Sequence, residues 1–166
     1  RGGGAVPGSG WGLKVVGMGP GSQAGYVAIN GSRVFPYPDS LDAVEAGGMP
    51  IVFLTSYHIL RSRGQMQSGD TVLVQAGASG VGTVLIQLAK AWGAKVIATA
   101  STQDKLDLCK SLGADVTINY TEADFEEVVK DETGGDGGQL VADCAGGEAV
   151  ETGVRCLASY GRPVGR

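Results

Sequence analysis

The chain has 166 residues, a length that suits about one domain and is sufficient to bury a hydrophobic core. Its composition, 43% hydrophobic and 18% charged, is that of a globular protein, and its net charge of −4 includes thirteen scattered basic residues. With no basic block, no long apolar run and no leader-like N-terminus, we expect no nucleic-acid partner, no membrane span and no secretory signal.

Cys109, Cys144 and Cys156 are the three cysteines of the chain. Their number is odd, each lies in an apolar stretch, and none has the paired spacing of a zinc site. We therefore expect reduced, buried thiols in an intracellular, cytoplasmic protein, with an organelle as the alternative location.

The first forty residues differ in pattern from the rest. Glycine makes up 29 of the 166 residues, and residues 1–20 look like a flexible, glycine-rich tail. Two short strands are predicted over residues 26–29 and 34–35, and two helices over residues 40–45 and 50–61. The change of periodicity predicts a domain boundary near residue 40.

From Ser68 onward, β-branched runs alternate with amphipathic helical periods, which is the pattern of a parallel sheet covered by helices. The helices are predicted between the glycine-rich turn and Gly93, from about 102 to 113, from 121 to 129 and from about 148 to 157. The strands are predicted over residues 71–75, 95–99, 116–120 and 140–142, with a fifth from about residue 160. The expected fold is α/β with a doubly wound parallel sheet.

A glycine-rich turn follows the first of these strands. Gly77, Gly80 and Gly82 have the spacing G-x-x-G-x-G, a permuted form of the dinucleotide fingerprint. Such a turn exposes backbone N–H groups at a helix start, where an anionic diphosphate binds favourably. The alternative is a tight strand-to-helix turn without a ligand. The strand before it and the amphipathic helix after it favour the nucleotide, and the missing Lys-Ser or Lys-Thr pair argues against a kinase-type loop.

The end of the second strand bears on the choice of cofactor. NAD sites usually place an acidic residue there to hold the ribose 2′-hydroxyl, and none is present over residues 97–103. Ser101 and Lys105 can instead donate hydrogen bonds to a 2′-phosphate. The alternative is that Ser101 or Thr102 caps the next helix and Lys105 is a surface charge. The pattern favours NADPH over NADH.

Taken together, these stretches resemble the medium-chain dehydrogenase/reductase superfamily, in its quinone oxidoreductase or zeta-crystallin branch. The resemblance implies a Rossmann-type nucleotide-binding domain. It also implies that the backbone of Ala78, Ser79, Gly80 and Val81 holds the diphosphate. The matching stretches, in family order, are residues 54–57, 69–74, 76–82, 112–115, 118–120, 133–137 and 143–147.

Four further residues acquire roles from the resemblance. Ser101 and Lys105 match residues that grip the 2′-phosphate. Tyr120 resembles a residue at the adenosine end of the cofactor, and its alternative is a core aromatic at a strand end. Thr55 resembles a residue near the nicotinamide ribose, and its alternative is a packing hydroxyl within a helix. No catalytic residue is assigned.

The chain also departs from the family pattern. The zinc-ligand spacings of the alcohol dehydrogenases are missing, and His58 is interpreted as a packed or surface side chain, so no metal is expected. Residues 21–39 resemble a remnant of the GroES-like catalytic domain. Residues 40–166 resemble an NADP-binding Rossmann domain truncated at its C-terminal end, where Pro163 is a poor residue for a central strand.

Three functional hypotheses remain open. The first is zinc-independent, NADPH-dependent reduction of a small-molecule quinone or α,β-unsaturated carbonyl. The second is an enoyl-thioester reductase domain of a fatty-acid or polyketide synthase, because residues 154–162 resemble those domains. The third is a non-catalytic NADPH-binding or structural module. A homodimer and a subunit of a larger assembly are both compatible with the pattern.

Overall fold

The computed structural model describes residues 12–165, which form two compact units that divide between Val52 and Phe53. The first unit contains strand β1 (Val15–Gly17), which pairs antiparallel with β2 (Val34–Pro36). The predicted second strand is therefore present, whereas the strand predicted over residues 26–29 is wrong. That segment is irregular, and the Asn30 side chain after it accepts a hydrogen bond from the Ser32 N–H and caps a short 3-10 helix, η1 (Gly31–Arg33).

Helix α1 (Ala43–Tyr57) replaces the two helices predicted over residues 40–45 and 50–61. Its start is a reciprocal capping arrangement, in which Asp42 Oδ1 accepts from the Glu45 N–H at 2.8 Å and Glu45 Oε2 accepts from the Asp42 N–H at 2.9 Å. Pro50 lies inside the helix without ending it. A short π-helix, η2 (His58–Arg63), continues the chain toward the sheet.

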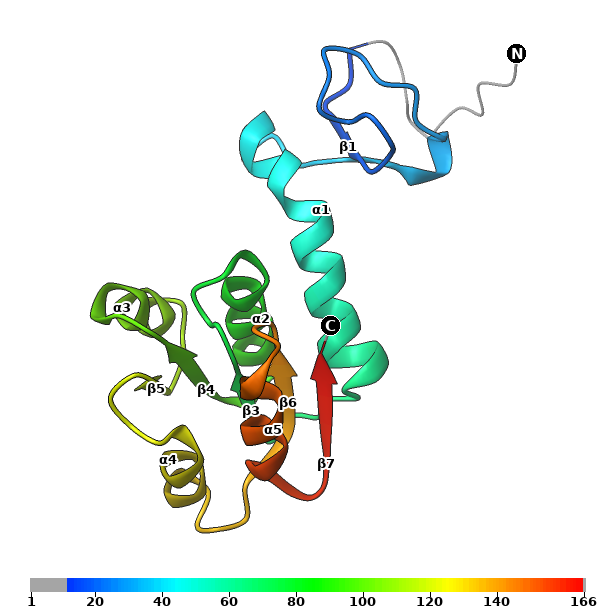
Figure 1. Ribbon diagram of the computed structural model, residues 1–166. Coiled ribbons are helices and arrows are strands. Elements are labelled where there is room, and N and C mark those ends of the chain that lie inside the picture. Colours follow the sequence, from blue (N-terminus) through cyan, green and yellow to red (C-terminus); the bar gives the residue numbers. More distant parts are fainter. Residues whose placement is uncertain (1–11, 166) are drawn as a thin grey trace. The chain divides into compact units, whose positions relative to one another are not determined.

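The second unit is built on a five-stranded parallel sheet in the order β5-β4-β3-β6-β7 (Figure 1). In chain order this is 3-2-1-4-5, so the winding direction reverses between β3 and β6, as in a Rossmann-type sheet. The predicted doubly wound α/β fold is confirmed. The strands are β3 (Thr71–Val74), β4 (Lys95–Ala100), β5 (Val116–Asn119), β6 (Gly138–Asp143) and β7 (Leu157–Gly165), and the helices are α2 (Gly80–Ala91), α3 (Gln103–Ser111), α4 (Phe125–Glu132) and α5 (Glu148–Arg155).

Two hydrophobic cores cover the two faces of this sheet, because successive strand side chains point to opposite faces. Val72 and Val74 pack with residues of α2, α3 and η2 in the first core. Leu73 and Ile97 pack with residues of α4, β6 and the end of α5 in the second core. The side chains at the ends of the strands therefore point to defined faces of the sheet.

Two elements differ from their predicted bounds. Helix α4 starts at Phe125 rather than at residue 121, because Asn119 Oδ1 accepts from the Thr121 N–H and forms a local turn, while Asp124 caps the helix. Strand β7 starts at Leu157 and includes Pro163, which lies opposite Val141. Proline is tolerated there because β7 is the edge strand of the sheet in the described part of the chain.

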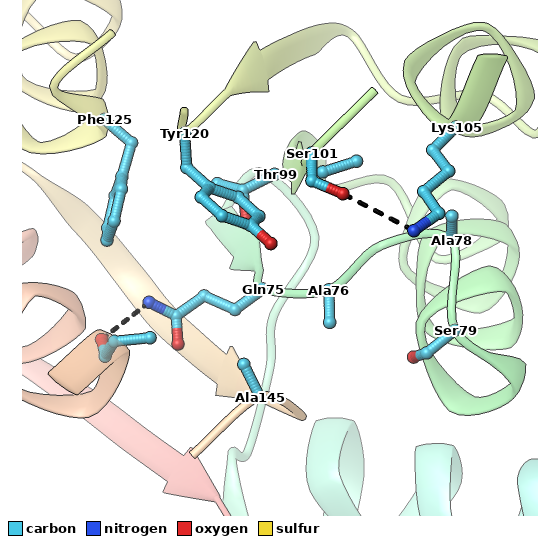
Figure 2. A pocket seen from close by; sticks show the side chains of 12 residues that line it. Gln75, Ala76, Ala78, Ser79, Thr99, Ser101, Lys105, Tyr120, Phe125 and Ala145 are labelled. Carbon is cyan, nitrogen blue, oxygen red and sulfur yellow. Dashed lines mark hydrogen bonds between the residues drawn. The ribbon is translucent and has the colours of Figure 1, made fainter. Parts of the chain in front are cut away.

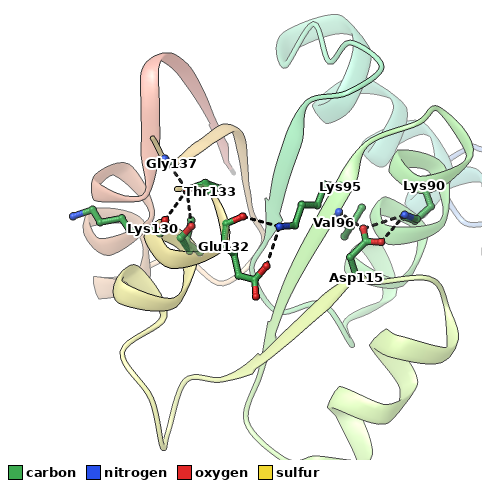
Figure 3. Close-up of polar contacts among 9 residues, drawn as sticks. Lys90, Lys95, Val96, Asp115, Lys130, Glu132, Thr133 and Gly137 are labelled. Carbon is green, nitrogen blue, oxygen red and sulfur yellow. Dashed lines mark hydrogen bonds and ion pairs between the residues drawn. The ribbon is translucent and has the colours of Figure 1, made fainter. Parts of the chain in front are cut away.

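Ion pairs lie near the start of β4, between the sheet and its helices (Figure 3). Lys90 Nζ donates to both carboxylate oxygens of Asp115, at 2.8 and 3.0 Å, and Asp115 Oδ2 also accepts from the Val96 N–H at 2.7 Å. Lys95 forms an ion pair with Glu132 at 2.9 Å. Within residues 12–165, no helix has both the length and the apolar character needed to cross a bilayer.

Candidate nucleotide-binding site

The turn after β3 is packed directly against the neighbouring strand and helix. Gly77 donates its N–H to the Thr99 carbonyl at 2.9 Å. A Cβ at Gly77 would lie 2.9 Å from the Sγ of Cys109 and 3.0 Å from the Cβ of Ala98. Glycine is therefore required at this position because no space remains for a side chain.

Gly82 has a different role within the same turn. A Cβ on Gly82 would lie 2.3 Å from the Ala76 carbonyl oxygen and 2.7 Å from the Gly77 carbonyl oxygen. Because both neighbours are backbone atoms, a side chain here could be accommodated only by moving the turn itself. Gly82 lets α2 begin immediately beside the end of β3, which brings the positive end of the helix to the carboxyl edge of the sheet.

The start of α2 presents backbone donors that the protein itself does not use. Ser79 is the N-cap, and its Oγ accepts from the Gly82 N–H at 3.0 Å. Within the described residues, the N–H groups of Ala78, Gly80 and Val81 donate to no protein group. Free N–H groups at a helix N-terminus fit an anionic diphosphate. These are the residues predicted to hold the diphosphate, and that role stays a prediction.

A cavity of about 360 Å³ lies beside this turn, at the carboxyl edge of the sheet. Figure 2 shows the side chains that line it. They come from the ends of β3, β4, β5 and β6 and from the first turns of α3, α4 and α5, so the cavity lies where ligands bind in doubly wound sheets. The lining residues are Gln75, Ala76, Ala78, Ser79, Thr99, Ala100, Ser101, Lys105, Tyr120, Phe125, Ala145 and Ala149.

Ser101 and Lys105 both line this cavity, and Lys105 Nζ donates to Ser101 Oγ at 3.4 Å. Thr102 occupies the N-cap position of α3, but its side chain makes no capping hydrogen bond. The hydroxyls of Ser101 and Thr102 therefore do not cap this helix. Within residues 12–165, Lys105 forms no ion pair and no acidic residue lines the cavity. A hydroxyl and an unpaired ammonium beside the diphosphate turn fit a second phosphate group.

The other predicted residues are placed differently. Tyr120 is half exposed and lines the cavity. Gly80 and Val81 follow Ser79 in the turn but do not line the cavity. Thr55 is exposed on α1 and does not line it either, so the structure does not bring Thr55 together with the other predicted residues.

Several cavity residues were not predicted as part of the site. Gln75 follows β3, Thr99 is the residue before the last in β4, and Phe125 begins α4. The alternation of side chains along the two strands would have placed Gln75 and Thr99 on one face. Nothing local in the sequence indicated that this face opens into a cavity.

The loop after β6 is shaped by a buried carboxylate. Asp143 Oδ1 accepts from the Ala145 N–H at 2.8 Å and from the Gly146 N–H at 3.0 Å, which fixes the loop beside the cavity. Burial, together with the neighbouring Asp143, raises the pKa of the Cys144 thiol to about 11. Cys144 is therefore a protonated thiol at neutral pH and a poor nucleophile.

His58 is a surface side chain at the start of η2, directly after α1. It is exposed, and its Nε2 accepts from Arg63 Nε at 3.3 Å. Residues 12–165 contain no group of three or more His, Cys, Asp and Glu side chains that could hold a metal ion.

The family model described as zinc-binding dehydrogenase matches residues 80–165, more than half of the chain. The chain belongs to this family. Within the medium-chain dehydrogenase/reductase superfamily it lies in the quinone oxidoreductase-like branch, of which it is a partial chain. The resemblance inferred from the sequence motifs is thereby confirmed.

Curated relatives include both single enzymes and large synthases. The chain is 36% identical to 2-haloacrylate reductase of Burkholderia sp, over 75% of the chain and 39% of that protein. It is 31% identical to a phenolphthiocerol/phthiocerol polyketide synthase of Mycobacterium tuberculosis, over 91% of the chain and 7% of that protein. The chain therefore spans well under half the length of these relatives.

Solved structures agree with this placement. An NAD-dependent alcohol dehydrogenase superposes with a TM-score of 0.84 at 40% identity, covering 87% of this chain and 42% of that one. Mycobacterial Rv1454c, solved complexed with NADPH, superposes with a TM-score of 0.75 at 38% identity, covering 80% of this chain and 41% of that one. A nicotinamide dinucleotide is thus the ligand class associated with this fold in both neighbours.

Proposed function

We propose that this chain is the NADPH-binding part of a zinc-independent oxidoreductase that reduces a small-molecule quinone or α,β-unsaturated carbonyl. The observation that carries the proposal is that Ser101 and Lys105 share one cavity with Ala78 and Ser79, at the turn where the N–H groups of Ala78, Gly80 and Val81 are free. A dinucleotide with a 2′-phosphate offers anionic groups to both places. Reductases among the relatives and a neighbour complexed with NADPH support it.

The residues of this chain act by binding and orienting the cofactor. The N–H groups of Ala78, Gly80 and Val81 would hold the diphosphate, and Ser101 and Lys105 would hold the 2′-phosphate. When bound, NADPH supplies the hydride for the reduction. The contribution of this chain is therefore a fixed position for the hydride donor.

An enoyl-thioester reductase domain of a polyketide synthase is the second candidate. It is favoured by matches to the phenolphthiocerol/phthiocerol synthase and to squalestatin tetraketide synthase, which cover 91% and 82% of this chain. The enoyl reductase of CurK also superposes with a TM-score of 0.78 at 31% identity. These matches bear on the acceptor, whereas the cofactor site is the same in both candidates.

Cofactor binding and turnover should be measured separately. Fluorescence titration of the purified chain with NADPH and NADH tests the cofactor, and NADPH should bind more tightly. Oxidation of NADPH by the intact parent protein should then be followed with a quinone, an enone and an enoyl thioester. Turnover of the thioester alone would favour the synthase domain, and tight binding with no turnover would favour a non-catalytic module.

Location and assembly are part of the same proposal. All three cysteines are free, and Cys109 and Cys156 are buried, which supports an intracellular protein with reduced thiols. Native mass spectrometry of the parent protein would distinguish a homodimer from a subunit of a larger assembly.

A further inference from the structure

Ser56 is a buried polar residue near the end of α1, within the second unit. With Ile59 and Leu60 it forms the buried face of this segment, since the three residues have the spacing of one helical face. Ile59 and Leu60 belong to the core on one face of the sheet, whereas Ser56 places a hydroxyl there with 0% exposure. A buried hydroxyl is unfavourable unless it is hydrogen-bonded, so the partner of Ser56 indicates the role of this residue.

The partner of Ser56 belongs to the first turn of α2. Ser56 Oγ donates to the Val81 carbonyl at 3.2 Å, and this is its only side-chain hydrogen bond within the described residues. A carbonyl oxygen has two lone pairs, so Val81 can accept from Ser56 and still take part in the hydrogen-bond ladder of α2. The bond joins residues that are 25 positions apart in the chain. It therefore attaches α1 to the helix start that carries the free N–H groups.

The peptide group between Val81 and Gly82 is held at both ends by serine hydroxyls. Its carbonyl accepts from Ser56, and its N–H donates to Ser79 Oγ at 3.0 Å. Gly80 and Gly82 flank Val81, and glycine has more backbone freedom than any other residue. The two hydrogen bonds therefore restrain the first turn of α2, where the backbone is intrinsically most flexible.

The segment that carries Ser56 also contacts the far end of α2. The rings of Tyr57 and Trp92 are nearly perpendicular, with 5.9 Å between their centroids, and the Arg61 guanidinium lies 4.5 Å from the centroid of the Trp92 ring. Trp92 is the C-cap of α2. The end of α1 and η2 therefore contact α2 at both of its ends, and Ser56 makes the contact beside the candidate diphosphate site.

We propose that Ser56 is a positioning residue for the cofactor: its hydroxyl fixes the first turn of α2 so that the N–H groups of Gly80 and Val81 face the diphosphate. This inference rests on the proposed function, because the diphosphate enters as part of NADPH. Hydrogen-bond donors stabilise an anion most when they are oriented before it binds, since binding then requires no further ordering. Ser56 acts through the Val81 carbonyl and does not line the cavity.

Calorimetric titration of the full chain with three ligands tests this role. NADPH and NADH both contain the diphosphate, whereas adenosine 2′-monophosphate contains the 2′-phosphate and no diphosphate. Ser56→Ala should weaken NADPH and NADH by the same factor, about three- to tenfold, as expected for the loss of one neutral hydrogen bond. The affinity for adenosine 2′-monophosphate should stay the same, because Ser101 and Lys105 are unchanged. An unchanged affinity for NADPH, or an equal loss for all three ligands, would overturn the proposal.

Hydrogen exchange in the free chain tests the restraint without a cofactor. The Gly82 amide belongs to the peptide group that Ser56 holds, so in Ser56→Ala it should exchange with solvent about threefold faster or more. Ser111→Ala is the matched control, since Ser111 Oγ also donates to a helix carbonyl, that of Leu108 at the end of α3. The control should change neither the exchange at Gly82 nor the three affinities. Equal exchange rates at Gly82 in the native chain and in Ser56→Ala would contradict the proposed restraint.

The outcomes separate this inference from the proposed function. If the native chain binds neither NADPH nor adenosine 2′-monophosphate, both fail. If Lys105→Ala weakens NADPH more than NADH while Ser56→Ala changes neither affinity, the proposed function stands and the positioning role of Ser56 is wrong.

Discussion

The ammonium of Lys105 lies 3.4 Å from the hydroxyl oxygen of Ser101, and both side chains line the cavity beside the glycine-rich turn. The contact joins the end of β4 to the first turn of α3. An anion at this point would receive a charge-assisted hydrogen bond from Lys105 and a neutral one from Ser101. We therefore propose that this pair distinguishes a phosphorylated ribose from an unmodified one.

Lys105→Ala should weaken NADPH binding by about 10- to 100-fold and change NADH binding much less, because a hydrogen bond from a charged group contributes about 1.5–3 kcal/mol. Fluorescence titration with both cofactors measures the difference. Lys110→Ala is the control, since Lys110 is an exposed lysine in the last turn of the same helix and does not line the cavity. Equal losses for both cofactors would show that Lys105 does not contact the 2′-phosphate.

Gly82→Ala should destabilise the protein by about 2 kcal/mol or more, because its Cβ would lie 2.3 Å from the Ala76 carbonyl oxygen. Cofactor binding should also weaken, since the displaced turn carries the free N–H groups. Gly47→Ala is a matched substitution in α1, where a Cβ meets nothing within 4 Å, and it should stabilise the helix by about 0.5–1 kcal/mol. Thermal unfolding followed by circular dichroism measures the change in stability of both variants. A Gly82→Ala variant as stable as the native chain would contradict the packing described for the turn.

Asp115 should contribute to stability in a pH-dependent way. Burial favours its neutral form, but hydrogen bonds from Lys90 and Val96 outweigh burial and lower the pKa of Asp115 below its ordinary value of 3.8. Because the folded-state pKa is lowered, the contribution is complete above pH 3.8 and is lost as the pH falls through the lowered pKa.

Asp115→Asn should therefore reduce stability at neutral pH by about 1 kcal/mol or less, as expected for a partly exposed pair. The difference from the native chain should shrink below pH 3.8. Urea unfolding at several pH values measures it, with the exposed Asp131→Asn as the control. A loss that stays constant into acid would rule out the carboxylate as its source.

Cys144 should react slowly with alkylating reagents at neutral pH. Burial, followed in importance by Asp143, raises the pKa of its thiol to about 11, and only the thiolate is the nucleophile. The labelling rate, followed by mass spectrometry, should keep rising between about pH 7 and 10 without reaching a plateau. A plateau below the ordinary pKa of 9.0 would contradict this expectation.

Much of the second unit was predictable because its signals are local. The strand predicted over residues 71–75 is β3 (Thr71–Val74), and the helix predicted to end at Gly93 is α2 (Gly80–Ala91). The first unit was harder, because β2 pairs with Val15–Gly17, a segment about twenty residues earlier in the chain. Local alternation over residues 26–29 suggested a strand where no partner strand exists among the described residues.

The sequence by itself determined the alternation of strands and helices and the glycine-rich turn, and it predicted that Ser101 and Lys105 contact a 2′-phosphate. Each depends on side-chain periodicity or on steric limits within a few residues. Only the tertiary structure decided that Gln75, Thr99 and Phe125 share one cavity with Lys105, and that Thr55 does not. Parallel pairing brings the ends of separate strands to one edge, and alternation sends their side chains to one face, so these neighbours are set by long-range register.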